Sequence, residues 1–360
     1  MRCPECGNEF RERGFRFCPY DGSRLEAPQW HRGKEEVSET VETGALIGGR
    51  YVVRRYLTKG AMARIFMADD QHTGQLVALK ILEKNRAKSS EVRERFLREA
   101  KAVSLIDNPC VVKILDMGEH DKRPFLVMEF LRGETLGERF DVEPRLDHKL
   151  ALWILLQAAD ALYAAHDKGI VHRDVKPDNI FIVGDTKQPT GIRVLDFGLS
   201  RLFQSQLTAT GTVIGTPGYM APEQVVADPV DQRTDIYGLG MIMYRMYAGC
   251  VPFDGKDDVI ILAKQLLRRP PRPSHYVDGL DPRVERVIMT TIRKRPEERY
   301  PSMKIFSDEL HKLQHPNAPL FAPELPNDWD ERARDRYELS SPLAKEVAKG
   351  YRKLLKEGEA

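Results

Sequence analysis

Hydrophobic and polar residues alternate over short stretches early in the chain and follow longer, helical patterns later. Three early stretches have the alternation or the apolar runs of β-strands: Arg50 to Phe66, Leu76 to Leu82 and Leu126 to Leu131. Between them, Glu91 to Leu105 has helical periodicity. Further on, Leu150 to His166 is typical of a buried helix, and Lys168-Gly169 is a good C-terminal signal for it.

Two charged residues lie on faces that this pattern predicts to be buried. Alternation along Val77 to Ile81 puts Ala78 and Lys80 on one face of a strand. Glu99 lies on the apolar stripe of the predicted helix, together with Phe96. Because a charge is rarely buried without a partner, we expect Lys80 to pair with Glu99. The alternative is that Glu99 is one of many surface charges on that helix.

Composition narrows the class of protein without naming a function. The chain has 360 residues and 41% hydrophobic content, enough for two or three domains with real cores. A net charge of +2 implies no global attraction to nucleic acid or membranes, and no apolar run approaches the length of a membrane span. Three of five cysteines fall in the first eighteen residues and leave no room for a signal peptide. A reducing compartment, the cytoplasm, is expected.

The densest group of candidate catalytic residues runs from Val171 to Ile180. It contains Asp174, an acid that can take a hydroxyl proton, then Lys176 two places on and Asn179 five places on. Phosphoryl transfer needs a positioned nucleophile, neutralised phosphate oxygens and a held metal, with little covalent chemistry from the protein. The string HRDxKPxN, followed after sixteen intervening residues by Asp196-Phe197-Gly198, resembles the serine/threonine protein kinases.

The resemblance covers about Tyr51 to Leu313 and implies both a fold and a set of roles. The implied fold class is α+β, and the implied fold is bilobal, with a small β-rich N-lobe and a larger α-helical C-lobe. By resemblance, Asp174 orients and deprotonates the acceptor hydroxyl and Lys176 steadies the γ-phosphate of ATP. Asn179 and Asp196 would hold magnesium (or manganese) ions.

The resemblance also implies an ATP site in the first half of the chain. Lys80, oriented by Glu99, would face the α- and β-phosphates, and the backbone from Glu129 to Leu131 would read the adenine edge. The residues implied to bind ATP are Lys80, Glu99, Gly60, Ala78, Met128 (the gatekeeper), Glu129, Leu131 and Asp196. Met128 alone would more often be ordinary core.

One motif departs from the family pattern. Where kinases have G-x-G-x-x-G, this chain has Thr58-Lys59-Gly60-Ala61-Met62-Ala63 and keeps only the middle glycine. Each added Cβ lifts the loop from the phosphates, so we expect weakened rather than abolished ATP binding. This loop is the only support for a rival hypothesis, a pseudokinase or scaffold module. Against that rival, the other six catalytic and ATP-binding motif residues are present in the expected order.

The segment from Asp196 to Glu223 is expected to carry the regulation. Arg173 would grip a phosphorylated residue there, and we predict autophosphorylation at Thr208 and Thr210. Thr216 would contact the catalytic residues and help select the acceptor hydroxyl. The alternative is that these threonines only make a polar loop.

Two further positions are expected to hold the framework of the larger lobe. Glu223 should form an ion pair with Arg299, and Asp235 should brace the catalytic loop. Cys110 and Cys250 are interpreted as small buried residues.

The first residues suggest a metal module. Cys3-Pro4-Glu5-Cys6-Gly7 recurs in altered form as Cys18-Pro19-Tyr20-Asp21-Gly22, and two such turns can converge on one zinc ion. The predicted ligands are Cys3, Cys6, Cys18 and Asp21, although a water or His31 could complete the shell instead of Asp21. The pattern resembles zinc-ribbon modules found ahead of some bacterial kinases. One alternative is a plain turn whose thiols bind no metal. The other is a nucleic-acid-binding module, which only the cysteines and a few basic residues support.

The chain therefore divides into four predicted parts. They are a zinc-ribbon-like module at 1–25, a linker at 26–49, a kinase domain at 50–313 and a C-terminal extension at 314–360 with one or two helices. The last helix has a basic surface and either packs on the adjacent lobe, which we favour, or docks on a partner. The expected partners are protein substrates and ATP, with a possible protein partner at the zinc module or the C-terminal helix.

Overall fold

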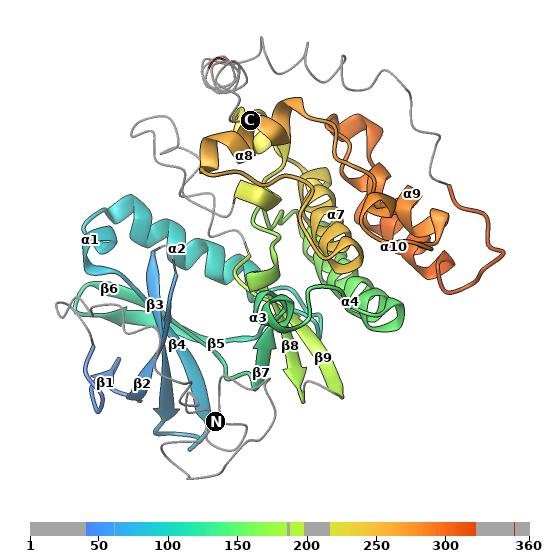
Figure 1. Ribbon diagram of the computed structural model, residues 1–360. Helices are drawn as coiled ribbons and strands as arrows, with labels where there is room; N and C mark the ends of the chain where they lie inside the picture. The colour runs from blue at the N-terminus through green and yellow to red at the C-terminus, as the bar shows by residue number, and fades with distance from the viewer. Residues whose placement is uncertain (1–40, 61, 186–187, 198–216, 322–348, 350–360) are drawn as a thin grey trace. The chain divides into compact units, whose positions relative to one another are not determined.

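The chain folds as two compact units. The computed structural model describes residues 41–60, 62–185, 188–197, 217–321 and 349 (Figure 1). Unit 1 comprises Met1–Thr135 with Phe181–Leu195, and unit 2 comprises Leu136–Ile180 with Asp196–Ala360. The described part of unit 1 is mostly strands, and that of unit 2 is mostly helices. The predicted combination of a small β-rich lobe and a larger helical lobe is confirmed.

Unit 1 is built on a six-stranded antiparallel sheet with the order β1-β2-β3-β4-β6-β5. The strands are β1 Leu46–Ile47, β2 Tyr51–Lys59, β3 Ala63–Asp70, β4 Leu76–Leu82, β5 Ile114–His120 and β6 Arg123–Glu129. Apolar residues of these strands, including Phe66, Leu79 and Val127, form its core. A second, three-stranded sheet has the order β7-β8-β9, with β7 Gly133–Thr135, β8 Ile180–Gly184 and β9 Pro189–Val194.

Two helices accompany the six-stranded sheet, α1 Lys84–Ala87 and α2 Ser90–Val103. The helix predicted from Glu91 to Leu105 is α2. The Ser89 side chain caps it by accepting a hydrogen bond from the Val92 amide, and Phe96, Ala100 and Val103 are buried as the periodicity predicts.

The end of the predicted linker is a strand instead of a linker. Leu46 and Ile47 pair antiparallel with Val52 and Tyr51. Ile47 is buried in the same unit 1 core cluster as Phe125, and Val41 and Ala45 pack against that cluster, so these apolar side chains help to hold the short strand against the sheet. A two-residue strand has too little alternation to be recognised in the sequence.

Unit 2 is mainly helical. Its α-helices are α3 Leu136–Val142, α4 His148–Asp167, α6 Pro222–Val225, α7 Gln232–Ala248, α8 Asp258–Leu267, α9 Pro282–Thr291 and α10 Met303–Lys312. The predicted helix from Leu150 to His166 is α4; Asp147 caps its start, and Gly169 follows its end with a φ of +72°. No helix in the described ranges is long and apolar enough to cross a membrane.

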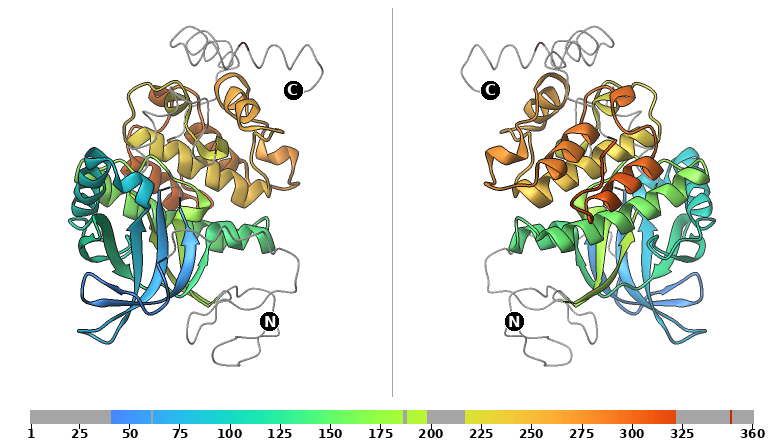
Figure 2. Two further views of the ribbon diagram at one scale, coloured as in Figure 1. Left: turned by 90° about the vertical axis from the view of Figure 1, so that its left-hand side faces the viewer. Right: turned by 90° about the vertical axis from the view of Figure 1, so that its right-hand side faces the viewer.

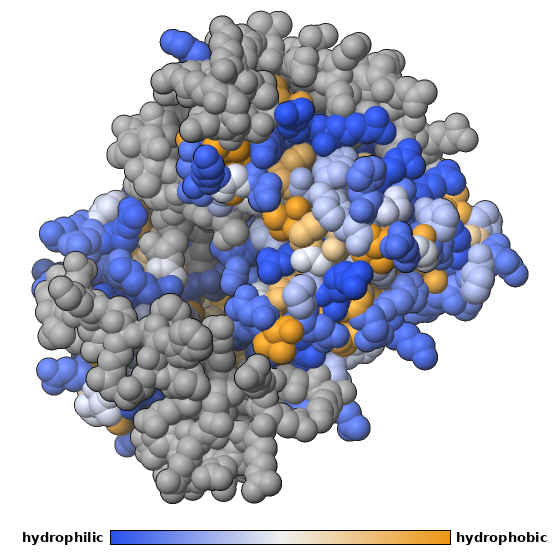
Figure 3. All heavy atoms as spheres, in the orientation of Figure 1, coloured by the Kyte–Doolittle hydropathy of each residue, from blue (hydrophilic) through white to orange (hydrophobic). Residues whose placement is uncertain are grey.

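Helix α7 is almost wholly buried and packs against α4, α9 and α10 (Figure 2). It also comes close to the chain around Val175: a Cβ on Gly238 would lie 2.8 Å from the Val175 Cβ and 2.9 Å from its carbonyl oxygen. Glycine therefore lets α7 come directly against the segment from Val171 to Ile180, which we call the catalytic string. On the face shown in Figure 3, the coloured residues are mostly hydrophilic, and the apolar ones form small separate groups.

Candidate active site

The buried carboxylate of Asp235 holds the backbone of the catalytic string. Asp235 lies in the first turn of α7 and accepts hydrogen bonds from the backbone amides of His172 and Arg173, both at 2.8 Å. Its Oδ2 also lies 2.7 Å from Nε2 of His166 at the end of α4. Arg173 has a backbone φ of +67°, which residues other than glycine seldom adopt. The hydrogen bonds to Asp235 hold the backbone in this conformation. The prediction that Asp235 braces the catalytic loop is confirmed.

Three predicted catalytic residues meet at one carboxylate. The ammonium of Lys176 lies 2.9 Å from Oδ2 of Asp174. The Asn179 amide nitrogen donates to the Asp174 carbonyl oxygen at 2.7 Å and to Oδ2 at 3.1 Å. Asn179 is buried, whereas the Asp174 side chain keeps 31% of its surface exposed. The acid is therefore fixed by two neighbours and still open to a substrate hydroxyl.

The oxygen atoms here suit a hard cation. Because both described bonds of the Asn179 amide to Asp174 use its nitrogen, its carboxamide oxygen is left as a potential metal ligand. Asp196, in the same unit, supplies a carboxylate and has a φ of +55°. The next residue, Phe197, is buried with its ring 4.6 Å from that of His172. Amide and carboxylate oxygens are what magnesium prefers, so the residues fit the predicted ion.

A buried ion pair between Arg299 and Glu223 holds the segment that follows residue 216. The Arg299 guanidinium donates two 2.8 Å hydrogen bonds to the two carboxylate oxygens of Glu223, and the Thr234 hydroxyl donates a third. Burial alone would raise the pKa of Glu223, but Arg299 outweighs it and holds that pKa below its ordinary value. The predicted ion pair is confirmed.

Gln224 is a functional residue that sequence reasoning missed. Its carboxamide oxygen accepts from the Ala221 amide at 3.0 Å, and its nitrogen donates to the Arg173 carbonyl oxygen at 2.7 Å. It therefore ties the start of α6 to the catalytic string. Its partners are backbone groups that only the fold brings close, so no motif of side chains in the sequence predicts these bonds.

The predicted ATP-binding residues of unit 1 lie on or beside the six-stranded sheet. Lys80 on β4 is 4% exposed and sits between Ile65 of β3 and Leu126 of β6 in the register. Ala78 is opposite Met128, which is 9% exposed. These positions agree with the predicted alternation. The ion pair of Lys80 with Glu99, which lies on α2, stays a prediction.

Glu129 and Leu131 lie where β6 ends. The Glu129 side chain is engaged within unit 1: it accepts from the Lys113 amide at 2.9 Å and from the Arg193 guanidinium at 3.1 Å. Its backbone amide donates to the Lys113 carbonyl. Leu131 is half-buried.

The β2–β3 turn, which contains Gly60 and Met62, stands where the glycine-rich loop is expected. The Gly60 amide donates to the Ala63 carbonyl at 2.8 Å, and the Met62 carbonyl accepts from the Glu83 amide at 2.9 Å. Ala63 is 0% exposed, at the start of β3 opposite Leu82. The Glu83 carboxylate lies 3.4 Å from both Lys59 and Arg64, the residues that flank the turn.

Several predicted site residues lie outside the described residues. They are Cys3, Cys6, Cys18, Asp21, Thr208, Thr210 and Thr216. Within the described ranges, no group of three or more His, Cys, Asp or Glu residues is arranged to hold a metal ion. Of the two cysteines in the described ranges, Cys110 is buried as expected, whereas Cys250, just past the end of α7, is only half-buried.

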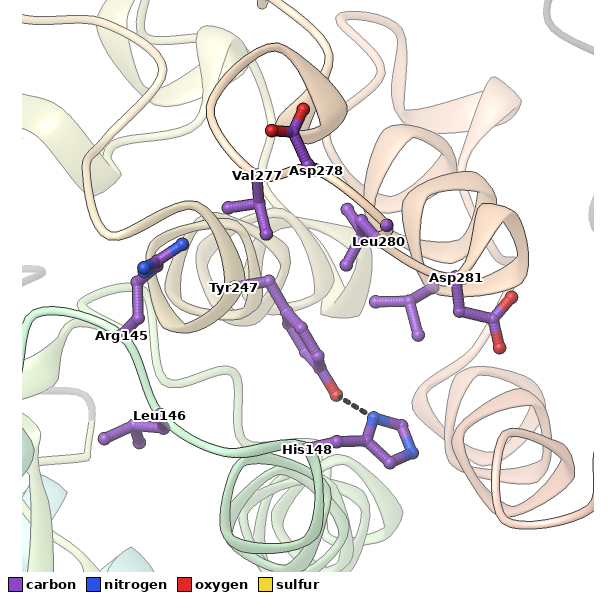
Figure 4. A pocket seen from close by; sticks show the side chains of 10 residues that line it. Arg145, Leu146, His148, Tyr247, Val277, Asp278, Leu280 and Asp281 are labelled. Atoms are coloured by element: carbon purple, nitrogen blue, oxygen red, sulfur yellow. Dashed lines mark hydrogen bonds between the residues drawn. The ribbon is translucent and has the colours of Figure 1, made fainter.

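Unit 2 also contains a pocket of about 410 Å³ (Figure 4). Arg145, His148, Tyr247 and Asp281 are among its lining residues, and the Tyr247 hydroxyl lies 2.9 Å from Nδ1 of His148. The lining residues include none of the predicted catalytic or ATP-binding positions. The pocket is therefore not part of the candidate active site.

Comparison with known proteins places the chain in a family. The protein kinase domain family matches residues 51–310. The chain is 39% identical over 269 residues to serine/threonine-protein kinase Pkn1 of Myxococcus xanthus and 36% identical over 258 residues to serine/threonine-protein kinase PrkC of Bacillus subtilis. These alignments cover 74% and 71% of this chain but only 38% and 39% of those relatives.

Solved structures agree. The crystal structure of the Mycobacterium tuberculosis PknI kinase domain matches with a TM-score of 0.61 and 27% identity, covering 76% of this chain and 99% of that one. The chain therefore belongs to the protein kinase domain family.

Proposed function

We propose that this chain is an active protein serine/threonine kinase that transfers the γ-phosphate of ATP to protein hydroxyls. The observation that carries the proposal is the convergence of Lys176 and Asn179 on Asp174, held by Asp235. The named relatives are serine/threonine-protein kinases. Because the chain spans about two fifths of their length, its substrates and partners are inferred from the chemistry of the site.

In this proposal Asp174 accepts the proton of the acceptor hydroxyl as that oxygen attacks phosphorus. Lys176 places a positive charge beside the transferred phosphoryl group, and Lys80 holds the phosphates that remain. Magnesium, held by Asn179 and Asp196, would supply neutralisation of the phosphate charge. Asn179 also fixes the Asp174 carboxylate, so acid and acceptor meet in one orientation.

The decisive experiment is ATP- and magnesium-dependent phosphate incorporation into myelin basic protein by the full chain. Asp174→Asn should lower the rate about 10³-fold, within the range of general base catalysis. Asp178→Asn is the matched control, because Asp178 is an exposed acid of the same string. Equal incorporation by wild type and Asp174→Asn would overturn the assignment, and so would no incorporation by wild type. Either result would favour the scaffold alternative.

We also propose control by autophosphorylation at Thr208 and Thr210. Arg173 supports this proposal, since its amide donates to Asp235 and its carbonyl accepts from Gln224, which fixes the backbone that carries its guanidinium. A phosphate on either threonine would then meet a positioned cation. Mass spectrometry after incubation with ATP should find the phosphate, and its absence from both residues would contradict the switch.

For the first 25 residues we propose a zinc site formed by Cys3, Cys6, Cys18 and Asp21. The support is chemical: three thiolates and a carboxylate at repeated spacing, in a segment too short for its own core. The full chain should bind about one zinc ion, and Cys3→Ser with Cys18→Ser should release it. Wild-type protein that contains no zinc would contradict the proposed zinc site. A cytoplasmic location and a protein partner for this module complete the proposal.

A further inference from the structure

A buried glutamine outside the kinase motifs contacts two distant parts of unit 2. Gln265 lies on α8 and is 0% exposed. Its amide nitrogen donates to the Gly218 carbonyl oxygen at 2.8 Å and to the Pro217 carbonyl oxygen at 3.3 Å. Its carboxamide oxygen accepts from the Tyr237 hydroxyl of α7. A buried carboxamide is stable only when its polar atoms are bonded, and here both are.

The partners of Gln265 fix which way its carboxamide faces. The carbonyl oxygens of Pro217 and Gly218 can only accept, so they hold the amide nitrogen on their side, while the Tyr237 hydroxyl donates to the carboxamide oxygen. Tyr237 is itself fixed, with the Arg299 guanidinium 4.8 Å from its ring centroid. The Gln265 side chain is therefore held from two sides, by the carbonyl oxygens of Pro217 and Gly218 and by Tyr237.

The backbone of Gln265 is also fixed. The buried ammonium of Lys294 donates to the Gln265 carbonyl oxygen at 2.6 Å and to that of Lys264 at 3.4 Å, at the end of α8. The same ammonium lies 4.2 Å from the ring centroid of Phe253. A cation at the C-terminus of a helix satisfies its last carbonyls and suits its dipole. Gln265 is thus anchored at both backbone and side chain.

Pro217 and Gly218 begin the short 3₁₀ helix η2, Pro217–Tyr219, immediately after Thr216. Helix α7 serves as the common reference: Asp235 binds the catalytic string, and Tyr237 two residues later binds Gln265. Gln224 adds a second link between these segments, because it hydrogen-bonds to the Ala221 amide and to the Arg173 carbonyl. The backbone next to Thr216 is thereby fixed relative to the catalytic acid.

We propose that Gln265 is a positioning residue for the acceptor hydroxyl. It holds the Pro217-Gly218 backbone in a fixed place relative to the catalytic string, so that the hydroxyl of the incoming substrate meets Asp174 correctly. The inference rests on the proposed kinase function. It deepens that function by assigning to α8 a part in accepting the protein substrate and no part in binding ATP.

The test compares Gln265→Met with Gln232→Met in the full chain. Gln232 is a matched control, since its amide nitrogen also donates to a proline carbonyl, that of Pro301 at 3.1 Å, but at an exposed site. The measurements are kcat/KM for myelin basic protein, KM for ATP, and the ratio of phosphothreonine to phosphoserine in the product. Melting temperatures confirm that each variant is folded.

We expect Gln265→Met to lower kcat/KM for the protein acceptor about tenfold or more, because small misplacements are costly in catalysis. Its KM for ATP should stay within about twofold of wild type, and its phosphothreonine ratio should change. Tyr237→Phe keeps the donor but removes the bond to the carboxamide oxygen of Gln265, which loosens the side chain, so a loss of about threefold is expected. Gln232→Met should match wild type.

The opposite outcomes are equally clear. If Gln265→Met behaves like Gln232→Met, or if it raises KM for ATP as much as it impairs acceptor use, the proposal is wrong. If Gln265→Met does not fold, Tyr237→Phe decides: acceptor kinetics equal to wild type overturn the proposal. Failure of the proposed kinase function looks different, since wild type and Asp174→Asn would then be indistinguishable.

Discussion

The catalytic loop of unit 2 and the β2–β3 turn of unit 1 are held in contrasting ways. Asp235 is buried, and the two backbone amides that it fixes lie in the catalytic string. The β2–β3 turn is clamped by Glu83, whose two cationic partners lie 3.4 Å away and whose side chain is partly exposed. Buried, fully bonded carboxylates hold geometry far more firmly than exposed ion pairs do.

The same contrast appears in the sequence. The string around Asp174 keeps every residue of the kinase pattern, whereas the turn keeps only Gly60. Transfer of a phosphoryl group depends steeply on the placement of a few atoms, while a turn that covers phosphates tolerates more variation. We therefore expect substitutions to act strongly near the catalytic loop and weakly near the turn.

Among the substitutions that test this contrast, the largest effect is expected from Asp235→Asn. The amide group would turn a donor toward backbone amides that need an acceptor, and we expect unfolding to become easier by about 3 kcal/mol. Because the catalytic string would shift, phosphate transfer should fall about 10²-fold. Urea unfolding and transfer to myelin basic protein measure the two effects.

Asp231→Asn is the control for Asp235→Asn. Asp231 caps the same helix at an exposed position, and asparagine is an equally good N-cap. Both variants behaving alike would show that the bonds to His172 and Arg173 do not hold the loop.

A smaller effect on transfer, with a clear pH signature, is expected from Glu223→Gln. The change leaves the Arg299 charge buried and unpaired, at a cost of about 3 kcal/mol at pH 7. Since folding lowers the pKa of Glu223, its contribution is complete above the ordinary value of 4.5. It is lost as the pH falls through the folded pKa.

The stability gap between wild type and Glu223→Gln should therefore be constant from pH 6 to 8 and shrink below about pH 4.5. Glu143→Gln is the comparison, because the Glu143 side chain, which lies 3.6 Å from Arg139, is itself 47% exposed. A gap as small as that of Glu143→Gln at pH 7 would contradict the buried pair.

These residues also show what the sequence could and could not predict. Asp174, Lys176 and Asn179 lie within six residues of one another, so one local motif, through its resemblance to the serine/threonine kinases, identified all three. Glu223, Arg299 and Asp235 are far apart and were found because the family pattern joins them.

Gln224, Gln265 and Lys294 were missed because they bind backbone carbonyls and amides, and any residue type supplies those. Only the folded chain shows which carbonyl lies within reach. Strand β1 was missed for a related reason: its one buried side chain, Ile47, becomes recognisable only beside Phe125.

In the β2–β3 turn, Ala63→Gly should lower KM for ATP about threefold. Glycine loosens the first residue of β3 and lets nearby amides approach the phosphates. The Ala63 side chain is buried, so the same change should cost about 1 kcal/mol of stability. Initial rates at varied ATP concentration measure the first effect, and thermal unfolding measures the second.

Ala68→Gly separates the two effects of Ala63→Gly. Ala68 is a buried residue of the same strand, further from the turn, and should lose similar stability with no gain in ATP use. An unchanged KM for ATP in Ala63→Gly would refute the idea that the missing glycines weaken ATP binding.

The smallest effect should come from Glu83→Gln. The change removes a charge between Lys59 and Arg64 while keeping the Glu83 amide bond to Met62, so the turn loses at most about 1 kcal/mol. KM for ATP should rise less than about threefold, and 0.5 M salt should abolish the difference from wild type because exposed ion pairs are screened. Glu91→Gln, at an exposed pair with Arg95, should leave KM for ATP unchanged at either salt concentration. A loss in Glu83→Gln that persists at high salt would mean that Glu83 holds the turn as firmly as Asp235 holds the catalytic loop, and the contrast between the two regions would fail.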